Sequence, residues 1–248
     1  MSGLKNKIVE WLRTQVKKSE CSGVVFGMSG GVDSSVVAVL SKMAFGDNCL
    51  GLIIPCHSDV KDMEYAMLVA KEFNIRTELV HLNSVFNTVL SVLETKLEVT
   101  DRKSTVIANI KPRLRMITLY AFASKYNYLV CGTGNKSELL TGYFTKYGDG
   151  GVDILPLGGL LKTQVIELAK ELKIPDVIIS RPPTAGLWQG QTDESELGLT
   201  YAELDRIITA IEKNEFSGFD MRLVDRVRNM IMKSEHKRKT IPIFVIDS

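Results

Sequence analysis

Hydrophobic positions along the chain predict helices and strands in alternation. Residues 4–18 place Ile8, Leu12 and Val16 on one face of a helix, as a 3.6-residue period requires. Short apolar runs, which are typical of strands buried on both faces, follow at residues 24–26, 50–54 and 128–131, and a further strand is predicted at residues 76–82. Helical patterns occupy residues 34–45, 62–73, 85–97 and 113–126, between these runs.

This alternation predicts a doubly wound α/β domain. Parallel strands need a crossover connection, so helices between strands indicate a mainly parallel sheet covered on both faces, with ligands at the carboxyl ends of its strands. Beyond residue 131 the chain contains aperiodic segments, rich in glycine, proline and polar residues, of the kind that often cover a site. These loops are residues 142–159 and 181–198; helices are predicted at 159–172, 201–213 and 221–234, and a short terminal strand at 241–246.

Composition narrows the class of protein. The chain has 248 residues, 45% of them hydrophobic and 24% charged, which predicts one ordinary globular domain over residues 1–248. A formal net charge of +2 gives no support for a nucleic-acid partner, and no apolar run approaches the roughly 18 residues of a membrane span. We therefore expect no nucleic-acid partner and no membrane association. The cysteines lack metal-ligand spacing, so we expect them to be buried thiols of a cytoplasmic protein.

The turn after the first predicted strand concentrates the candidate chemistry. It reads Gly27-Met28-Ser29-Gly30-Gly31-Val32-Asp33-Ser34. Paired glycines let the backbone approach a ligand closely, and N–H groups at the start of a helix form an anion site, so the loop is suited to phosphate. Phosphate would repel Asp33 unless a cation lay between them, which predicts a bridging Mg²⁺. The loop has neither the Walker A lysine nor the GxGxxG spacing.

This loop resembles the SGGxDS motif of the ATP pyrophosphatases, which cleave ATP to AMP and pyrophosphate. Its fixed letters should occur by chance about once per million positions. Two later segments are similar to the GT(x)NxxE and GxxTKYGDGG signatures of NAD synthetases. They read Gly132-Thr133-Gly134-Asn135-Lys136-Ser137-Glu138 and Gly142-Tyr143-Phe144-Thr145-Lys146-Tyr147-Gly148-Asp149-Gly150-Gly151. Further matches continue in order to His236-Lys237-Arg238, so the resemblance to ammonia-dependent NAD synthetases covers nearly the whole chain.

The resemblance implies a Rossmann-like, adenine nucleotide alpha-hydrolase fold and a set of site residues. The ATP contacts that it implies are Gly27, Met28, Ser29, Gly30, Gly31, Val32, Asp33, Ser34, Thr133, Lys162 and Thr184, with Mg²⁺ held by Asp33 and Glu138. The implied contacts to deamido-NAD are Arg113, Lys146, Asp153, His236 and Lys237. Cations among them suit the anionic groups of a doubly phosphorylated acid.

The resemblance also implies a reaction. The nicotinate carboxylate of deamido-NAD would attack the α-phosphate of ATP, pyrophosphate would leave, and ammonia would displace AMP from the adenylate to give NAD. Glutamine-dependent relatives carry an additional amidase domain of about 250 residues. We expect no glutaminase domain here, so ammonia would be the direct nitrogen source. Relatives of this type are homodimers that bind substrate across the subunit boundary, and we expect the same of this chain.

Other interpretations remain for the residues and for the protein. Arg113 shares a helix with Lys111 and Arg115, where a solvated basic face is the usual explanation; Glu138 could only stabilise a helix start, and His236 could lie on a solvated helix end. A rival enzyme is another ATP pyrophosphatase, such as a tRNA thiolase or a GMP-synthetase-like amidase, but a thiolase should show catalytic cysteines and a basic surface. A non-catalytic nucleotide sensor is the remaining alternative, and the retained carboxylates argue against it.

Overall fold

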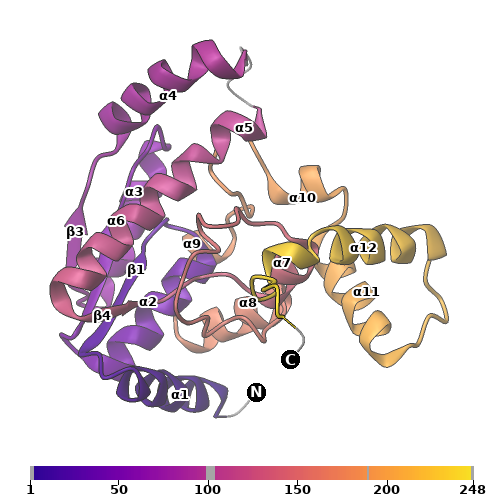
Figure 1. Ribbon diagram of the computed structural model, residues 1–248. Helices are drawn as coiled ribbons and strands as arrows, with labels where there is room; N and C mark the ends of the chain where they lie inside the picture. The colour runs from indigo at the N-terminus through magenta and orange to yellow at the C-terminus, as the bar shows by residue number, and fades with distance from the viewer. Residues whose placement is uncertain (1–2, 99–103, 189, 247–248) are drawn as a thin grey trace.

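A parallel sheet forms the centre of the computed structural model, which describes residues 3–98, 104–188 and 190–246 (Figure 1). Within these residues the sheet has four strands in the order β3-β2-β1-β4. The strands are β1 (Gly23–Gly27), β2 (Cys49–Ile53), β3 (Thr77–Leu79) and β4 (Tyr128–Val130). A parallel bridge between Cys131 and Ile154 adds a rudimentary neighbour at the β4 edge.

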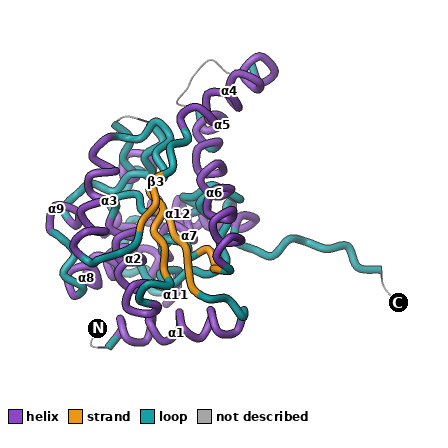
Figure 2. Tube along the Cα trace, turned by 90° about the vertical axis from the view of Figure 1, so that its left-hand side faces the viewer, coloured by secondary structure: helices purple, strands orange, loops and turns teal. Residues whose placement is uncertain are grey.

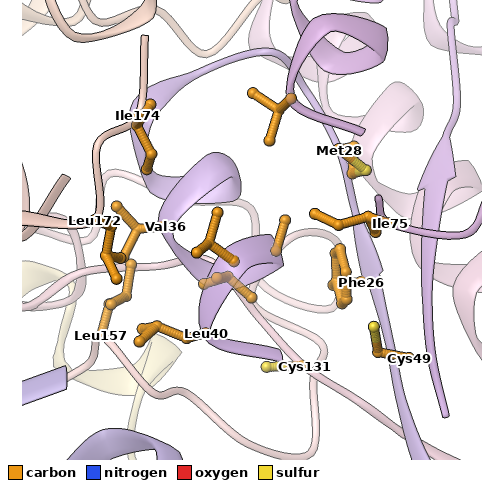
Figure 3. Close-up of a cluster of buried hydrophobic side chains, with 14 of the residues drawn as sticks. Phe26, Met28, Val36, Leu40, Cys49, Ile75, Cys131, Leu157, Leu172 and Ile174 are labelled. Atoms are coloured by element: carbon orange, nitrogen blue, oxygen red, sulfur yellow. The ribbon is translucent and has the colours of Figure 1, made fainter. Parts of the chain in front are cut away.

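Helices cover both faces of the sheet. One face packs against α1 (Leu4–Lys18), α2 (Val32–Phe45), α3 (Val60–Glu72) and α8 (Lys162–Glu171). The other packs against α4 (Asn83–Leu97), α5 (Thr105–Ala108) and α6 (Ile110–Tyr126). Successive strand residues point to opposite faces, so Phe26 joins the first core with Leu40 (Figure 3), whereas Val25 joins the second. The doubly wound α/β prediction is confirmed.

The order of the strands determines where a ligand can bind. The chain builds β1, β2 and β3 outward in one direction, and then returns to place β4 on the other side of β1. The direction of winding therefore reverses between β1 and β4, and a doubly wound sheet opens a crevice at the carboxyl ends of two such strands. The glycine-rich loop leaves β1 at this point, and residues 131–135 leave β4 beside it.

The chain after β4 is mainly helical, and residues 201–233 lie to one side of the sheet (Figure 1). Its elements are α7 (Lys136–Thr141), α9 (Asp176–Ile179), α10 (Asp193–Leu197), α11 (Tyr201–Lys213), α12 (Met221–Lys233) and the 3₁₀ helix η1 (Glu235–Lys237). Helices α11 and α12 bury a separate apolar cluster around Leu204, Ile208 and Val224. Each helix in the described ranges is too short or too polar to span a bilayer.

Several predicted elements differ from the structure, and the strand predicted at residues 76–82 is limited to Thr77–Leu79. The strand predicted at residues 241–246 is wrong: this tail is extended, pairs with no strand in the described part of the chain and leaves the body of the molecule (Figure 2), with Phe244 90% exposed. An apolar run becomes a strand only where a sheet edge accepts its hydrogen bonds. The helix predicted at residues 159–172 begins three residues later, at Lys162, and residues 159–161 precede it in a non-helical conformation.

Candidate active site

A cavity of about 780 Å³ lies at the carboxyl ends of β1 and β4, where the winding reverses. Its volume suits a nucleotide-sized ligand. The segments that line it include residues 27–29, 31–34, 131–133, 142–149, 181–188 and 236–237. The predicted site residues on its walls are Gly27, Met28, Ser29, Gly31, Val32, Asp33, Ser34, Arg113, Thr133, Glu138, Lys146, Lys162, Thr184, His236 and Lys237. Gly30 and Asp153 are not on its walls.

The glycine-rich loop presents free backbone donors to the cavity. Gly31 is the N-cap of α2 and provides no side-chain cap, so the first N–H groups of this 14-residue helix point toward the cavity without an intrahelical partner. The hydroxyl oxygens of Ser29 and Ser34 lie 3.0 Å apart, and Ser34 Oγ also donates to the Gly31 carbonyl at 3.0 Å. The loop is thus a preformed anion site that combines backbone donors, hydroxyl groups and the positive end of a helix dipole.

Gly30 has a structural role rather than a wall position. Its φ angle is +77°, and a Cβ atom here would lie 2.4 Å from the carbonyl oxygen of Asp62 in α3. Only glycine avoids both the backbone strain and this clash. Gly30, the first glycine of the SGGxDS motif, therefore lets the loop pass close against α3, and this contact fixes the direction in which the anion site opens.

A buried cluster of one cation and two carboxylates lies beside this anion site. Lys162 Nζ contacts Asp33 Oδ2 and lies 3.4 Å from Glu138 Oε1. The lysine side chain is only 3% exposed, and the two carboxylates are exposed by 15% and 18%. The three residues come from α2, α7 and α8, so the fold joins residues that the sequence separates by more than 100 positions.

Burial and charge shift the proton affinities of this cluster. Burial, together with the charge of Asp33, raises the pKa of Glu138 to about 8, although Lys162 opposes the shift. Burial by itself would lower the pKa of Lys162, but the two carboxylates raise it overall, so its ammonium group stays charged. Strongly shifted groups in a cavity indicate a functional site.

The cationic residues predicted for the second substrate lie on another wall of the cavity. Arg113 is exposed, and its guanidinium donates to the carbonyl of Lys146 at 3.3 Å. Lys146 Nζ in turn donates to the carbonyl of His236 at 2.7 Å. Lys237 Nζ donates to two carbonyls of the 142–149 loop, at 2.7 and 2.8 Å, and burial lowers its pKa. The structure therefore brings these four residues together.

Asp153 is the predicted substrate residue that the cavity excludes. Its Oδ1 accepts a hydrogen bond from the Tyr120 hydroxyl at 2.9 Å, and its Oδ2 accepts one from the Val130 N–H at 2.7 Å. Both oxygens thus have protein partners at the outer edge of β4. The observed contacts are structural ones, and its contact with substrate stays a prediction.

The alternative that the helix of Arg113 presents a solvated basic face is wrong for Lys111 and Arg115, because both side chains contact the protein interior. Lys111 is buried, and its Nζ donates to the carbonyl of Leu187 at 2.6 Å. Arg115 donates to the Ile54 carbonyl and to Ser58 Oγ, each at 3.1 Å. A third cation, Arg181, pairs with Asp62 of α3. Lys111 and Arg181 thereby hold the 181–188 segment against the cavity.

The sequence model of one known family, described as NAD synthase, matches residues 4–241. The chain belongs to this family. An NH(3)-dependent NAD(+) synthetase of Carboxydothermus hydrogenoformans is 47% identical over 233 residues, which cover 94% of this chain and 93% of that protein. The family prediction is confirmed, and its members are ligases.

Solved structures agree with this membership of the NAD synthase family. A structure of NMN synthetase from Francisella tularensis superimposes with a TM-score of 0.88 at 36% identity, and covers 98% of both chains. The NH3-dependent NAD synthetase of Campylobacter jejuni gives a TM-score of 0.82 at 29% identity, again with 98% of both chains covered.

Two buried residues position the cluster of Asp33, Lys162 and Glu138, and sequence reasoning missed them as site residues. Asn135 caps α7 and donates from Nδ2 to Asp33 Oδ1 at 3.0 Å, so it links the β4 loop to the β1 loop. Asp205, on α11, accepts from the Thr163 N–H at 2.8 Å and from the Ser137 hydroxyl, which anchors the start of α8 and hence Lys162. The available signal for Asp205 was a carboxylate on the apolar face of an amphipathic helix.

Proposed function

We propose that this chain uses ATP to convert deamido-NAD to NAD with ammonia, by way of an adenylated carboxylate, and releases AMP and pyrophosphate. The observation that carries the proposal is the Asp33–Lys162–Glu138 cluster, buried beside the uncapped start of α2 in one cavity. The name of the 47% identical relative, an NH(3)-dependent NAD(+) synthetase, supports the choice of substrates.

The anion site and the cluster suit adenylation. The backbone N–H groups of residues 32–34 and the hydroxyls of Ser29 and Ser34 would bind the β- and γ-phosphates, which become the leaving pyrophosphate. Thr133 and Thr184, which also line the cavity, would contact the rest of ATP. The nicotinate carboxylate would then attack the α-phosphate. Positioning and charge neutralisation provide the rate enhancement, so no protein nucleophile is required.

The donor set fits a magnesium ion. Asp33 and Glu138 supply hard carboxylate oxygens from the first turns of α2 and α7, and Mg²⁺ is commonly held by one or two carboxylates together with substrate phosphates. No three His, Cys, Asp or Glu residues converge as a closed metal cage in the described ranges, so phosphate and water would complete the shell. When bound, the ion would neutralise the charge of the polyphosphate.

The second substrate would occupy the wall formed by Arg113, Lys146, His236 and Lys237. The cationic groups of Arg113, Lys146 and Lys237 suit the pyrophosphate and the carboxylate of deamido-NAD. A contact between Asp153 and this substrate would require its oxygens to exchange their hydrogen bonds with Tyr120 and Val130. We place the enzyme in the cytoplasm, which its free and largely buried cysteines support.

We further propose that the enzyme is a homodimer that associates through α4, α5 and α6. Large apolar side chains on these neighbouring helices are exposed to solvent, and apolar surface that one chain leaves uncovered can mark an interaction site. They are Val85 and Val92 on α4, Val106 on α5 and Ile117 on α6. Arg113 is exposed on the same helix as Ile117, so a partner at this surface would lie next to the wall that binds deamido-NAD.

Ile117→Asp is expected to weaken the dimer by about tenfold or more, because it places a carboxylate in an apolar interface. Ile117 is 60% exposed in one chain, so the substitution should not disturb the folded monomer. Sedimentation velocity over a range of protein concentrations measures the dissociation constant. Val177→Asp is the matched control, because Val177 is also an exposed apolar residue but lies on α9, outside the proposed interface. Equal dissociation constants for both variants and the parent chain would refute this interface.

The test of the reaction itself needs the purified chain, ATP, Mg²⁺ and an ammonium salt. With deamido-NAD we expect equal amounts of NAD, AMP and pyrophosphate. Formation of ADP would reject adenylation. Because one similar structure is that of an NMN synthetase, nicotinic acid mononucleotide is assayed in parallel. A higher kcat/KM for the mononucleotide would change the substrate assignment while leaving the adenylation chemistry intact.

A further inference from the structure

Asp193, the first residue of α10, has a buried carboxylate oxygen without a hydrogen-bond partner. The residue is 4% exposed. Its Oδ2 accepts a hydrogen bond from the Tyr201 hydroxyl at 3.0 Å, whereas Oδ1 receives none from the described part of the chain. A buried acceptor left without a donor costs about 1–3 kcal/mol. Native proteins rarely tolerate this cost unless a water molecule, an ion or a ligand supplies the donor.

The position of this carboxylate connects it with the reaction. Asp193 lines the same cavity as Lys162 and Glu138 and lies within electrostatic reach of both. The ammonium group of Lys162 already contacts Asp33 and lies near Glu138. Among these carboxyl groups, Asp193 is the one that lacks a contacting cation in the described part of the chain. A small positively charged ligand that donates hydrogen bonds would supply the donor that Oδ1 lacks.

Neighbouring groups favour a cation with several N–H donors. The Tyr143 hydroxyl lies close to Asp193 and donates its hydrogen to Glu196 Oε2 at 2.6 Å, so its oxygen keeps acceptor capacity. The Tyr201 hydroxyl likewise donates to Asp193 and can accept in return. A tetrahedral ammonium ion could donate to Asp193 Oδ1 and to such oxygens together.

We infer that Asp193 Oδ1, with the hydroxyls of Tyr143 and Tyr201, binds the ammonium ion that supplies the amide nitrogen. This inference rests on the proposed function and assigns the position of its third substrate. The bound ion loses one proton to solvent to become ammonia. The nitrogen lone pair then forms the bond to the acyl carbon, and the bond from that carbon to the AMP oxygen breaks, its electron pair leaving with AMP. A second proton leaves the nitrogen to complete the amide.

The test is Asp193→Asn, which keeps the size of the side chain and its ability to accept from Tyr201. At saturating ATP and deamido-NAD, we expect KM for ammonium to rise about 10- to 100-fold, the size of effect given by loss of one charge-assisted hydrogen bond. Exchange of pyrophosphate into ATP, dependent on deamido-NAD, reports adenylation without ammonia and should persist. Hydroxylamine, a mostly uncharged nucleophile at neutral pH, should lose less activity than ammonium.

Glu194→Gln is the matched control, because it changes the adjacent carboxylate, which accepts from the Tyr201 N–H and does not line the cavity. It should leave KM for ammonium unchanged. An unchanged KM in a folded Asp193→Asn enzyme overturns the inference. So does loss of pyrophosphate exchange in that variant, since Asp193 would then serve adenylation. Absence of exchange in the parent enzyme instead rejects the proposed function, and the ammonium site with it.

Discussion

Asp33→Ala lowers kcat for NAD formation by about a thousandfold or more. Asp33 lies at the start of α2, and its carboxylate faces both the anion site and the Lys162 ammonium group. The substitution removes one of the two proposed Mg²⁺ ligands, and metal-assisted charge stabilisation is worth several kcal/mol at about 1.4 kcal/mol per factor of ten. Steady-state release of AMP and pyrophosphate, followed at increasing Mg²⁺, measures the loss. Added Mg²⁺ should restore little.

Asp47→Ala is the control for this experiment, since it removes a carboxylate that is 93% exposed and pairs only with Lys42 in a surface salt bridge. Such pairs contribute little, so its activity and thermal stability should match those of the parent chain. Near-normal turnover of a folded Asp33→Ala enzyme would show that the loop after β1 does not bind a metal-associated polyphosphate, and the proposed function would fail with it.

The sheet could be predicted from the sequence because strands that are buried on both faces are apolar at nearly every position. Residues 24–26 and 50–54 are continuous apolar runs, and they form the two central strands of the structure. The tail at 241–246 has the same composition and forms no strand in the described structure. Local pattern measures the tendency of a segment to be extended, whereas pairing depends on which sheet edge lies within reach. Which sheet edge a segment can reach depends on the fold, so the hydrophobic pattern alone does not predict strand pairing.

The candidate site could be predicted where chemistry is local in sequence. The loop after β1 carries its own signal, because glycines, hydroxyls and a carboxylate occur within a few residues at the start of a helix. Asp205 acts over a distance: it reaches the start of α8 from another helix. Asp193 lies in the segment at 181–198 that was predicted as an aperiodic loop, and its unpartnered oxygen appears only once α10 packs beside Tyr201. Such roles depend on three-dimensional contacts and leave no periodic trace.

Lys162 shows how the structure changes the meaning of a predicted contact. The resemblance implies that this residue contacts ATP, and the structure shows its ammonium group between two protein carboxylates. The two findings are compatible if the lysine also neutralises the carboxylates that would hold Mg²⁺. On this interpretation Lys162 contributes both to catalysis and to the stability of the cluster, and the two contributions can be separated by varying pH.

Lys162→Met is expected to lower kcat by about 10²–10³-fold, because it removes a preorganised donor to a reacting phosphate. It should also destabilise the fold by about 3–5 kcal/mol above pH 8, because it removes one partner of a buried ion pair. The stability effect should depend on pH. Burial and Asp33 already raise the pKa of Glu138 to about 8, and removal of the opposing ammonium group raises it further.

A carboxyl group whose pKa is higher in the folded state than in the unfolded state stabilises the fold at low pH, and this stability is lost as pH rises through the folded-state pKa. The Lys162→Met enzyme should therefore approach the parent chain in stability at pH 6, where Glu138 is protonated in both, and fall behind as pH rises past about 8. Urea unfolding at pH 6 and pH 9 measures the difference. Lys136→Met, which breaks a more exposed pair with Glu212, should show no comparable change with pH. A destabilisation of Lys162→Met that is equal at both pH values would mean that the lysine contributes packing alone, and that the two carboxylates are not held as a charged pair for a cation.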